Sequence, residues 1–251
     1  MSDDLLIHRD GGVLTLVFNR PDQLNALSGN MVLAAAEEIE KSEDRVIVIT
    51  GTGRAFCTGA DVSGLDPSRV DDAVGAANRL ITAVLSAGRP VVAAVNGPAA
   101  GVGCSLAVAA DFTIAHESAY FLLSFANIGL MPDGGATEIV AASIGRARAM
   151  RMAMLAERLS APVAAEIGLI HKAFGEADYA DEVSSLVAAL AAGPTQSYAR
   201  SKAAINASTL GSLEQAFARE REGQFALMKT EDFVEGITGF LQKRPAKFLG
   251  R

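Results

Sequence analysis

Alternation of apolar and polar residues marks the first part of the chain, and helical spacing follows it. Alternating residues over Leu5 to Arg9 and over Val13 to Phe18, on either side of Asp10-Gly11-Gly12, predict a β-hairpin. Pro21 ends this pattern. A helix is expected from Ser28 onward, because apolar residues recur on one face and charged residues occupy the other. The apolar positions are Met31, Ala35 and Ile39.

Two later runs, Val46 to Thr50 and Val91 to Val95, are apolar without interruption, which is typical of strands buried on both faces. Between them lies a stretch with helical spacing that ends at Gly88, and Asp111 to Ala115 resumes strand character. Tyr120 to Phe125 indicates a further short strand. This alternation of strands and helices predicts an α/β fold with a parallel sheet.

The last part of the chain is expected to be helical. Residues 136–155 are rich in Ala, Met, Arg and Leu and are interrupted at Gly145. An amphipathic stripe follows at Val183, Leu186, Val187 and Leu190, and three more candidate helices are separated by Pro194, Gly211 and Thr230. The 251 residues, half of them hydrophobic, suit one large domain. We therefore expect an α/β core over residues 1–195 and a helical region of the same domain over residues 196–251.

A glycine turn follows each of the two apolar strands. Gly51 to Asp61 reads GTGRAFCTGAD, and Asn96 to Asp111 reads NGPAAGVGCSLAVAAD. A strand, turn and helix of this kind leaves the first backbone N–H groups of the helix unpaired, at the positive end of its dipole, where an oxygen with negative charge is favoured. Two such turns can aim two N–H groups at one oxygen. The alternative is that the glycines only allow close packing of helix and sheet.

These segments resemble the signature stretches of the enoyl-CoA hydratase/isomerase (crotonase) family. The resemblance extends over nearly the whole chain, in five motifs that follow the family's order: NRP with LNAL from Asn19, GRAFCTGADVSGL from Gly53, the stretch from Asn96, IGLMPDGG from Ile128, and the tail from Glu235 to Arg244. It implies a spiral of repeated ββα units, a C-terminal helical trimerisation region, a homotrimer or dimer of trimers, and an acyl-CoA substrate.

The resemblance also implies a catalytic arrangement. The backbone N–H groups of Ala60 and Val102 would form an oxyanion hole for the thioester carbonyl. Hydratases of the family use two glutamates, and this chain has Ser105 and Phe125 in those places. Asp133 matches a position where some members carry a functional aspartate, so double-bond isomerisation by one carboxylate is favoured over hydration by two.

Three alternatives stay open at this point. Asp133 precedes a predicted helix and is equally interpreted as its N-cap, while the remaining glutamates are expected on solvated helix faces or at caps. The protein is alternatively a non-catalytic acyl-CoA binding or scaffold protein that has lost both glutamates, or a hydratase that uses other residues.

Coenzyme A is expected only as part of the substrate, with no separate cofactor. The resemblance assigns its contacts to Ala26, Arg54, Asp61, Phe240 and Lys243. A Lys-Arg pair at a helix end is otherwise a common solvated terminus. The irregular segment from Asp61 to Arg69 is predicted to be a lid over the site.

Composition argues against several other functions. A net charge of −7 without a basic cluster lacks the electrostatic footprint of nucleic-acid binding. The chain has no apolar run long enough to span a bilayer and no secretory h-region, so we expect no membrane partner and a cytoplasmic protein. Cys57 and Cys104 are expected to be reduced and packed, and the three scattered histidines offer no metal spacing. Both glycine turns lack the third glycine of a dinucleotide fingerprint, with Phe56 and Leu106 in its place.

Overall fold

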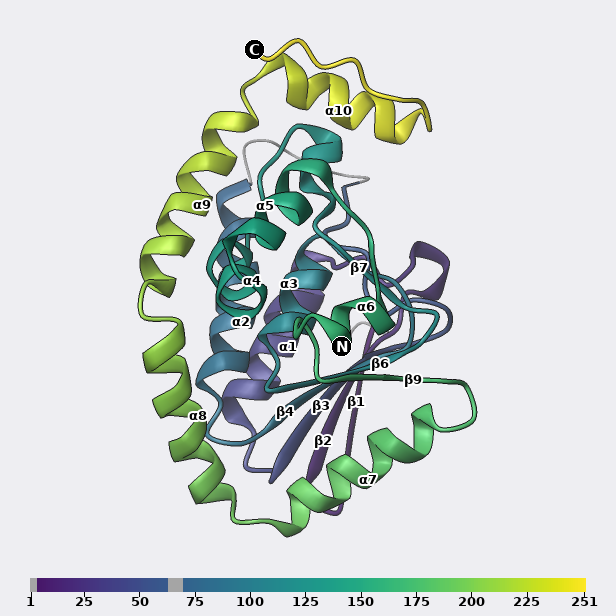
Figure 1. Ribbon diagram of the computed structural model, residues 1–251, viewed down its shortest axis with the longest axis vertical. Coiled ribbons are helices and arrows are strands. Elements are labelled where there is room, and N and C mark those ends of the chain that lie inside the picture. The colour runs from purple at the N-terminus through teal and green to yellow at the C-terminus, as the bar shows by residue number, and fades with distance from the viewer. Residues whose placement is uncertain (1–3, 63–69) are drawn as a thin grey trace.

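The computed structural model describes residues 4–62 and 70–251 (Figure 1). The predicted hairpin is confirmed: β1 (Leu5–Asp10) pairs antiparallel with β2 (Val13–Phe18) through a turn whose two glycines have positive φ. Three units along the chain have the order strand, strand and helix: β1-β2-α1, with the 3-10 helix η1 (Pro21–Gln23) before α1, then β4-β5-α3, and then β6-β7 followed by the 3-10 helix η3 (Ser124–Ile128). Between the first two units, β3-α2 has a single strand. This repetition agrees with the spiral that the resemblance implies.

Most of the strands form one six-stranded sheet in the order β1-β2-β3-β4-β6-β9. Every neighbouring pair after the hairpin is parallel, as predicted. A smaller sheet of three strands has the order β5-β7-β8. The larger sheet is completed by β3 (Val46–Gly51), β4 (Val91–Val95), β6 (Phe112–His116) and β9 (Lys172–Phe174), and the smaller one consists of β5 (Ala99–Ala100), β7 (Tyr120–Leu122) and β8 (Leu159–Ser160).

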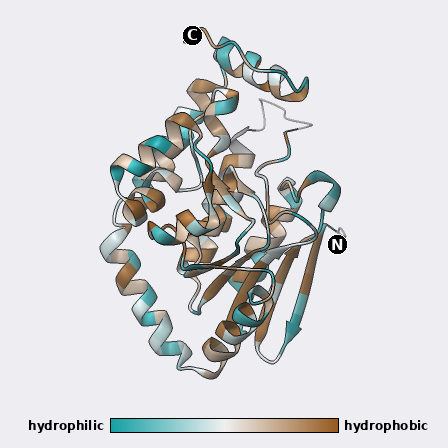
Figure 2. Cartoon of the chain, turned by 45° about the vertical axis from the view of Figure 1, so that its right-hand side comes forward, coloured by the Kyte–Doolittle hydropathy of each residue, from teal (hydrophilic) through white to brown (hydrophobic). Residues whose placement is uncertain are grey.

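Helices cover both faces of the large sheet, so that β3 and β4 are buried on either side (Figures 1 and 2). On β3, Ile47 and Ile49 belong to the main core, whereas Val46 and Val48 pack toward α7 (Tyr179–Ala192). The period of two along a strand produces this division. The main core also contains residues of α1 (Gly29–Lys41), α2 (Val70–Ser86) and α3 (Val102–Ala109). Ser28 is the N-cap of α1, as its predicted start requires.

The last part of the chain is mostly helical, as its residue spacing predicts. A break at Gly145 separates α4 (Ala136–Ile144) from α5 (Arg146–Leu155). In Figure 1, α8 (Thr195–Thr209) and α9 (Leu213–Leu227) run along one flank of the molecule, and α10 (Glu231–Leu241) lies at one end. Three strands, β5, β8 and β9, and the short helix α6 (Ala161–Glu166) were not predicted, because segments of two to six residues show no clear periodicity.

Within residues 4–62 and 70–251, none of the helices combines the length and the apolar character needed to cross a bilayer. The predicted lid, Asp61 to Arg69, falls mostly on residues 63–69, which lie outside the described residues.

Candidate active site

The two glycine turns lie side by side. A parallel bridge joins Cys57 to Ala99, with hydrogen bonds from Cys57 N to Pro98 O (3.1 Å) and from Ala100 N to Cys57 O (2.9 Å). The same number of residues leads from this bridge to Gly59 in one segment and to Gly101 in the other. Both glycines have positive φ, and a Cβ on Gly59 would lie 3.2 Å from Ala100 O. Side chains at these glycines would therefore strain the backbone and separate the turns.

The backbone after each glycine directs an N–H group away from the rest of its loop. Leu27 N donates to Gly59 O (2.8 Å) and Asp61 N donates to Leu27 O (3.0 Å), so Ala60 between them points its own N–H in the opposite direction. Val102 is the first residue of α3, where a helix has no intrahelical acceptor for its N–H. Among backbone carbonyls of the described residues, neither N–H has a hydrogen-bond acceptor. The structure thus brings Ala60 and Val102 to adjacent turns, as the predicted oxyanion hole requires.

The buried side chain of Asn25 holds the first glycine turn, residues 51–61, in place. It is fully buried and donates to Thr52 O (2.9 Å) and Ala55 O (2.7 Å), while its Oδ1 accepts from Arg20 N (2.8 Å). Asn96, at the end of β4, donates to Gly53 O (2.8 Å) in the same loop. The loop that carries Arg54 is therefore fixed from two directions, and the Arg54 side chain is exposed.

Arg20 is a site residue that the sequence analysis missed. Its guanidinium donates to Ala26 O (2.6 Å) and forms an ion pair with Asp61 (2.8 Å). Two of the predicted CoA contacts, Ala26 and Asp61, are thereby held beside each other. Arg20 belongs to the motif Asn19-Arg20-Pro21, which was the only indication of its role. The sequence alone does not distinguish a solvated surface arginine from one that binds two partners in the fold.

Asp133 lies against the helix that begins at Val102. A Cβ on Gly134 would lie 3.2 Å from Ser105 Cβ and 3.4 Å from Val102 Cγ2, so only glycine allows this turn to pack on the first turns of α3. Ser105 Oγ donates to the Asp133 carbonyl (2.8 Å). Ser105, at a position to which the resemblance assigns a glutamate in hydratases, therefore holds the backbone of Asp133.

The Asp133 carboxyl is buried, and one of its oxygens has no hydrogen-bond partner in the described chain. Oδ2 accepts from Gln224 Nε2 (2.8 Å), and Oδ1 has no partner. Burial raises the pKa of Asp133 to about 7; the Gln224 hydrogen bond opposes this shift and the charge of Glu220 adds to it. A carboxyl with this pKa exchanges its proton readily near neutral pH.

The N-cap interpretation of Asp133 is wrong. The N-cap of α4 is Gly135, which has no side chain, and Glu220 of α9 takes its place. Glu220 Oε2 accepts from Gly135 N (2.7 Å), and Oε1 accepts from Thr137 N (2.9 Å) and Thr137 Oγ1 (2.5 Å). Glu220 is fully buried, which also corrects the expectation that the remaining glutamates are solvated or at local caps. Burial raises the pKa of Glu220, and the hydrogen bonds from Thr137 and Gly135, at the positive end of the α4 dipole, oppose this shift.

The remaining predicted residues are distributed as follows. Phe125 is buried in η3 (Ser124–Ile128). The helix α10 packs closely on η3 at Gly236, where a Cβ would lie only 2.5 Å from Ile128 C. Phe240 and Lys243, at the end of α10, are exposed. Cys57 and Cys104 are free thiols, and burial raises the pKa of each to about 12, so neither is a reactive thiolate.

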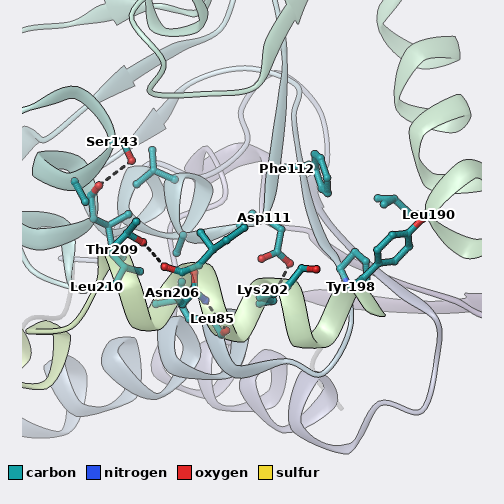
Figure 3. Close-up of a pocket in the computed structure, with 18 residues that line it drawn as sticks. Leu85, Asp111, Phe112, Ser143, Leu190, Tyr198, Lys202, Asn206, Thr209 and Leu210 are labelled. Atoms are coloured by element: carbon teal, nitrogen blue, oxygen red, sulfur yellow. Dashed lines mark hydrogen bonds and ion pairs between the residues drawn. The ribbon is translucent and has the colours of Figure 1, made fainter. Parts of the chain in front are cut away.

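A cavity of about 460 Å³ lies away from these turns, beside α8 and the C-terminal end of α3 (Figure 3). Lys202 and Asp111 meet at its wall with Nζ and Oδ2 2.8 Å apart. None of the residues that line it is a predicted site residue. Lys202 bonds both Asp111 and the Val84 carbonyl, and Asn206 donates to the Leu85 carbonyl, which indicates a structural role for the ion pair.

A family model described as "Enoyl-CoA hydratase/isomerase" matches residues 8–251. The chain belongs to the enoyl-CoA hydratase/isomerase family. A crystal structure of an enoyl-CoA hydratase from Mycobacterium avium subsp. paratuberculosis K-10 superposes with a TM-score of 0.92 at 43% identity, with 98% of each chain covered. The predicted crotonase-like fold is thus confirmed, and the protein is an enzyme of this family.

Relatives in the family carry the names of different reactions. A protein of Rhodobacter capsulatus named "Probable enoyl-CoA hydratase" is 40% identical over 96% of this chain and 95% of its own. The "1,2-epoxyphenylacetyl-CoA isomerase" of Escherichia coli is 36% identical over the whole of both chains. Membership in the family therefore leaves the choice between hydration and isomerisation to the residues of the site.

Proposed function

We propose that this enzyme isomerises a double bond in an acyl-CoA thioester, with Asp133 as the group that moves the proton. The observation that carries the proposal is the buried Asp133 carboxyl, with a pKa raised to about 7, on a turn packed against Val102. The N–H groups of Ala60 and Val102 would bind the thioester oxygen, which gains negative charge during the reaction. The nearby positions 105 and 125 hold a serine and a phenylalanine, so a second carboxylate of the kind that hydration uses is missing from them.

The reaction balances with one carboxylate and no water. Ionised Asp133 takes a proton from the carbon next to the thioester carbonyl of a 3-enoyl-CoA. The C–H electron pair forms a double bond to the carbonyl carbon, and the carbonyl electrons move to the oxygen. The carbonyl then re-forms, the double bond moves to the 2,3 position, and protonated Asp133 returns its proton to the fourth carbon. Two relatives named as isomerases, one for 1,2-epoxyphenylacetyl-CoA and one for a trans-2-decenoyl group on acyl carrier protein, support isomerisation in general.

The coenzyme A moiety is proposed to lie along the loop that carries Arg54. Arg54 is exposed on a loop fixed by Asn25 and Asn96, and its charge suits the phosphates. Arg20 holds the Ala26 carbonyl and the Asp61 carboxylate in place. Both groups are proposed to make polar contacts with the nucleotide or the pantetheine part of coenzyme A. Phe240 and Lys243 are proposed to reach coenzyme A bound to the same or a neighbouring subunit.

A homotrimer or a dimer of trimers is proposed as the assembly. Support comes from large apolar side chains left exposed on the C-terminal helices and tail, namely Ile205, Val234, Phe240, Leu241, Phe248 and Leu249. Five of the six lie on α10 and the tail after it, and exposed apolar groups gathered in this way mark interaction surfaces. In Figure 1 these helices form the outer flank and one end of the molecule.

Turnover of a panel of 2-enoyl, 3-enoyl and dienoyl-CoA thioesters, read by product identity, tests the proposal. We expect double-bond isomers as products, and we expect Asp133→Asn to lower turnover by roughly a hundredfold or more while thioester binding and the melting temperature persist. Asp181→Asn, on the exposed face of α7, is the matched control and should leave turnover unchanged. Hydrated products, or turnover that survives Asp133→Asn, contradict the proposal. Tight binding without any product identifies a scaffold instead.

A further inference from the structure

Gln224 of α9 contacts Asp133 in a way that makes its two carboxyl oxygens different. Gln224 is buried, and its Nε2 donates to Met131 O (3.0 Å) as well as to Asp133 Oδ2 (2.8 Å). The Met131 carbonyl only accepts hydrogen bonds, so the amide must present nitrogen to it. Rotation of the amide by half a turn would bring Gln224 Oε1 against that carbonyl. The orientation of the amide, and hence an N–H group facing Oδ2, is therefore fixed.

This contact decides which oxygen carries the proton. An oxygen that faces a fixed N–H group is an acceptor and has no room for a proton of its own on that side. Oδ1 has no partner in the described chain, so the proton of the neutral acid belongs there. We propose that Gln224 and Glu220 are positioning residues for Asp133: Gln224 confines the exchangeable proton to Oδ1, and Glu220 fixes the turn that carries Asp133. This inference rests on the proposed function of Asp133.

Glu220 acts on the same turn through its backbone. It binds the N–H groups of Gly135 and Thr137, on the C-terminal side of Asp133, and so holds the start of α4. Its negative charge also faces Asp133 and disfavours a second charge nearby. Glu220 and Gln224 are four residues apart on one helix and therefore point to the same side.

Two glycines allow α9 to come this close. A Cβ on Gly223 would overlap Met131 Sδ, and a Cβ on Gly135 would lie 2.9 Å from Leu213 Cδ1. A side chain at either position would force Met131 or Leu213 to move, and at Gly135 it would also meet a φ of 76°. The close approach serves a contact between segments 91 residues apart in the sequence.

Few other charges surround Asp133 in the described chain. From α9, Glu220 acts on it directly, and Arg219 acts on Glu220. From α4, Glu138 is turned toward the surface, where it accepts from Ser212 N (2.8 Å). The contacts from α2 and α3 on the adjacent Gly134 are the uncharged side chains of Ile81, Val102 and Ser105. Replacement of Glu220 or Gln224 should therefore change the titration of Asp133 with little interference.

Infrared spectroscopy of the whole protein tests the proposal without requiring turnover. The C=O band of protonated Asp133 is assigned by its absence in Asp133→Asn and followed against pH. In Gln224→Met, the loss of the hydrogen bond to Oδ2 should move this band to higher wavenumber and raise its apparent pKa by about one unit. Glu220→Gln removes a negative charge and should lower the apparent pKa. Gln215→Met, on the exposed side of α9, is the matched control and should match the wild type.

Steady-state kinetics on the best thioester of the panel add a second readout. For Gln224→Met we expect kcat to fall by roughly tenfold to a hundredfold with KM changed little, because a misplaced proton affects the chemical step more than binding. A band position and pKa in Gln224→Met equal to those in Gln215→Met overturn the positioning role, even if Glu220→Gln does not fold. If Asp133→Asn keeps turnover, the proposed function fails, and the catalytic part of this inference fails with it. An unchanged infrared result with Asp133→Asn inactive overturns the inference alone.

Discussion

Lys202 Nζ lies 2.8 Å from Asp111 Oδ2, and this contact joins α8 to the residue before β6 across 91 residues of sequence. Both side chains are largely buried, and Figure 3 shows them pointing toward each other. Lys202 Nζ also donates to Val84 O (2.6 Å) near the end of α2. Asp111 Oδ2 accepts in addition from Val91 N (2.7 Å), where β4 begins. One ion pair therefore connects two helices and two strands.

Lys202→Met should destabilise the protein by about 3–5 kcal/mol, because it leaves the Asp111 carboxylate buried without its charged partner. Urea unfolding followed by circular dichroism measures the change. Lys41→Met, which breaks an exposed ion pair with Glu37 on α1, is the matched control and should change stability by less than about 1 kcal/mol. Equal effects of the two variants would contradict the structural role of the Lys202 pair.

Asn25→Ala should destabilise the first glycine turn. The variant leaves the Thr52 carbonyl without its donor, removes the shorter of the two hydrogen bonds to the Ala55 carbonyl and puts alanine at a φ of 57°, so a loss of about 2–4 kcal/mol is expected. Asn30→Ala, exposed on α1, is the control and should be neutral or slightly stabilising. Thermal unfolding compares the two. A melting temperature of Asn25→Ala equal to that of Asn30→Ala would show that the buried amide is dispensable.

Stability should fall as the pH rises, in part because of Asp133. Its pKa is raised from 3.8 to about 7 in the folded state, so between these values the folded protein keeps a proton that the unfolded chain has lost. The stabilising contribution is complete below the lower pKa and is lost as the pH rises through the higher one, by on the order of 4 kcal/mol. Denaturant unfolding of wild type and Asp133→Asn at about pH 4 and about pH 8 measures this contribution. The variant should gain on the wild type at the higher pH, and parallel profiles would count against the raised pKa.

Arg54→Ala should weaken coenzyme A binding and reduce its dependence on salt. An exposed arginine beside a phosphate contributes about 1 kcal/mol at low ionic strength, which corresponds to a few-fold change in Kd. Calorimetric titration of coenzyme A at low and high salt measures both effects. Arg148→Ala, on the exposed part of α5, is the control. An unchanged affinity at low salt would exclude the proposed place of the phosphates.

The C-terminal helices should hold the oligomer together. Light scattering at micromolar protein should give the mass of a trimer or hexamer, and Val234→Asp with Phe240→Asp should lower it, because charged groups are costly in a buried interface. Met154→Asp, also at an exposed apolar residue but on α5, tests whether any such charge has this effect. A monomeric wild-type protein would remove the proposed assembly.

Local patterns in the sequence determined the elements and the two turns. The spacing of apolar residues predicted the N-terminal hairpin, the helix after Ser28 and the strands that begin at Val46 and Val91. Such spacing depends only on residues a few positions apart in the sequence. Glycines with positive φ at Gly59 and Gly101 fixed the places of Ala60 and Val102, because turn chemistry is also local. The motifs alone also showed that Ser105 and Phe125 stand at the two positions to which the resemblance assigns glutamates.

The partners of Asp133 were decided only by the tertiary structure. Gln224 and Glu220 reach its turn from 91 and 85 residues further along the chain, and Lys202 reaches Asp111 across 91. In the sequence these are ordinary polar residues on amphipathic helices, and nothing in their spacing distinguishes them from solvated neighbours. Their burial depends on how α8 and α9 fold back over the sheet. Desolvation then gives each of them a different chemistry: a fixed donor, a distant helix cap and a buried cation.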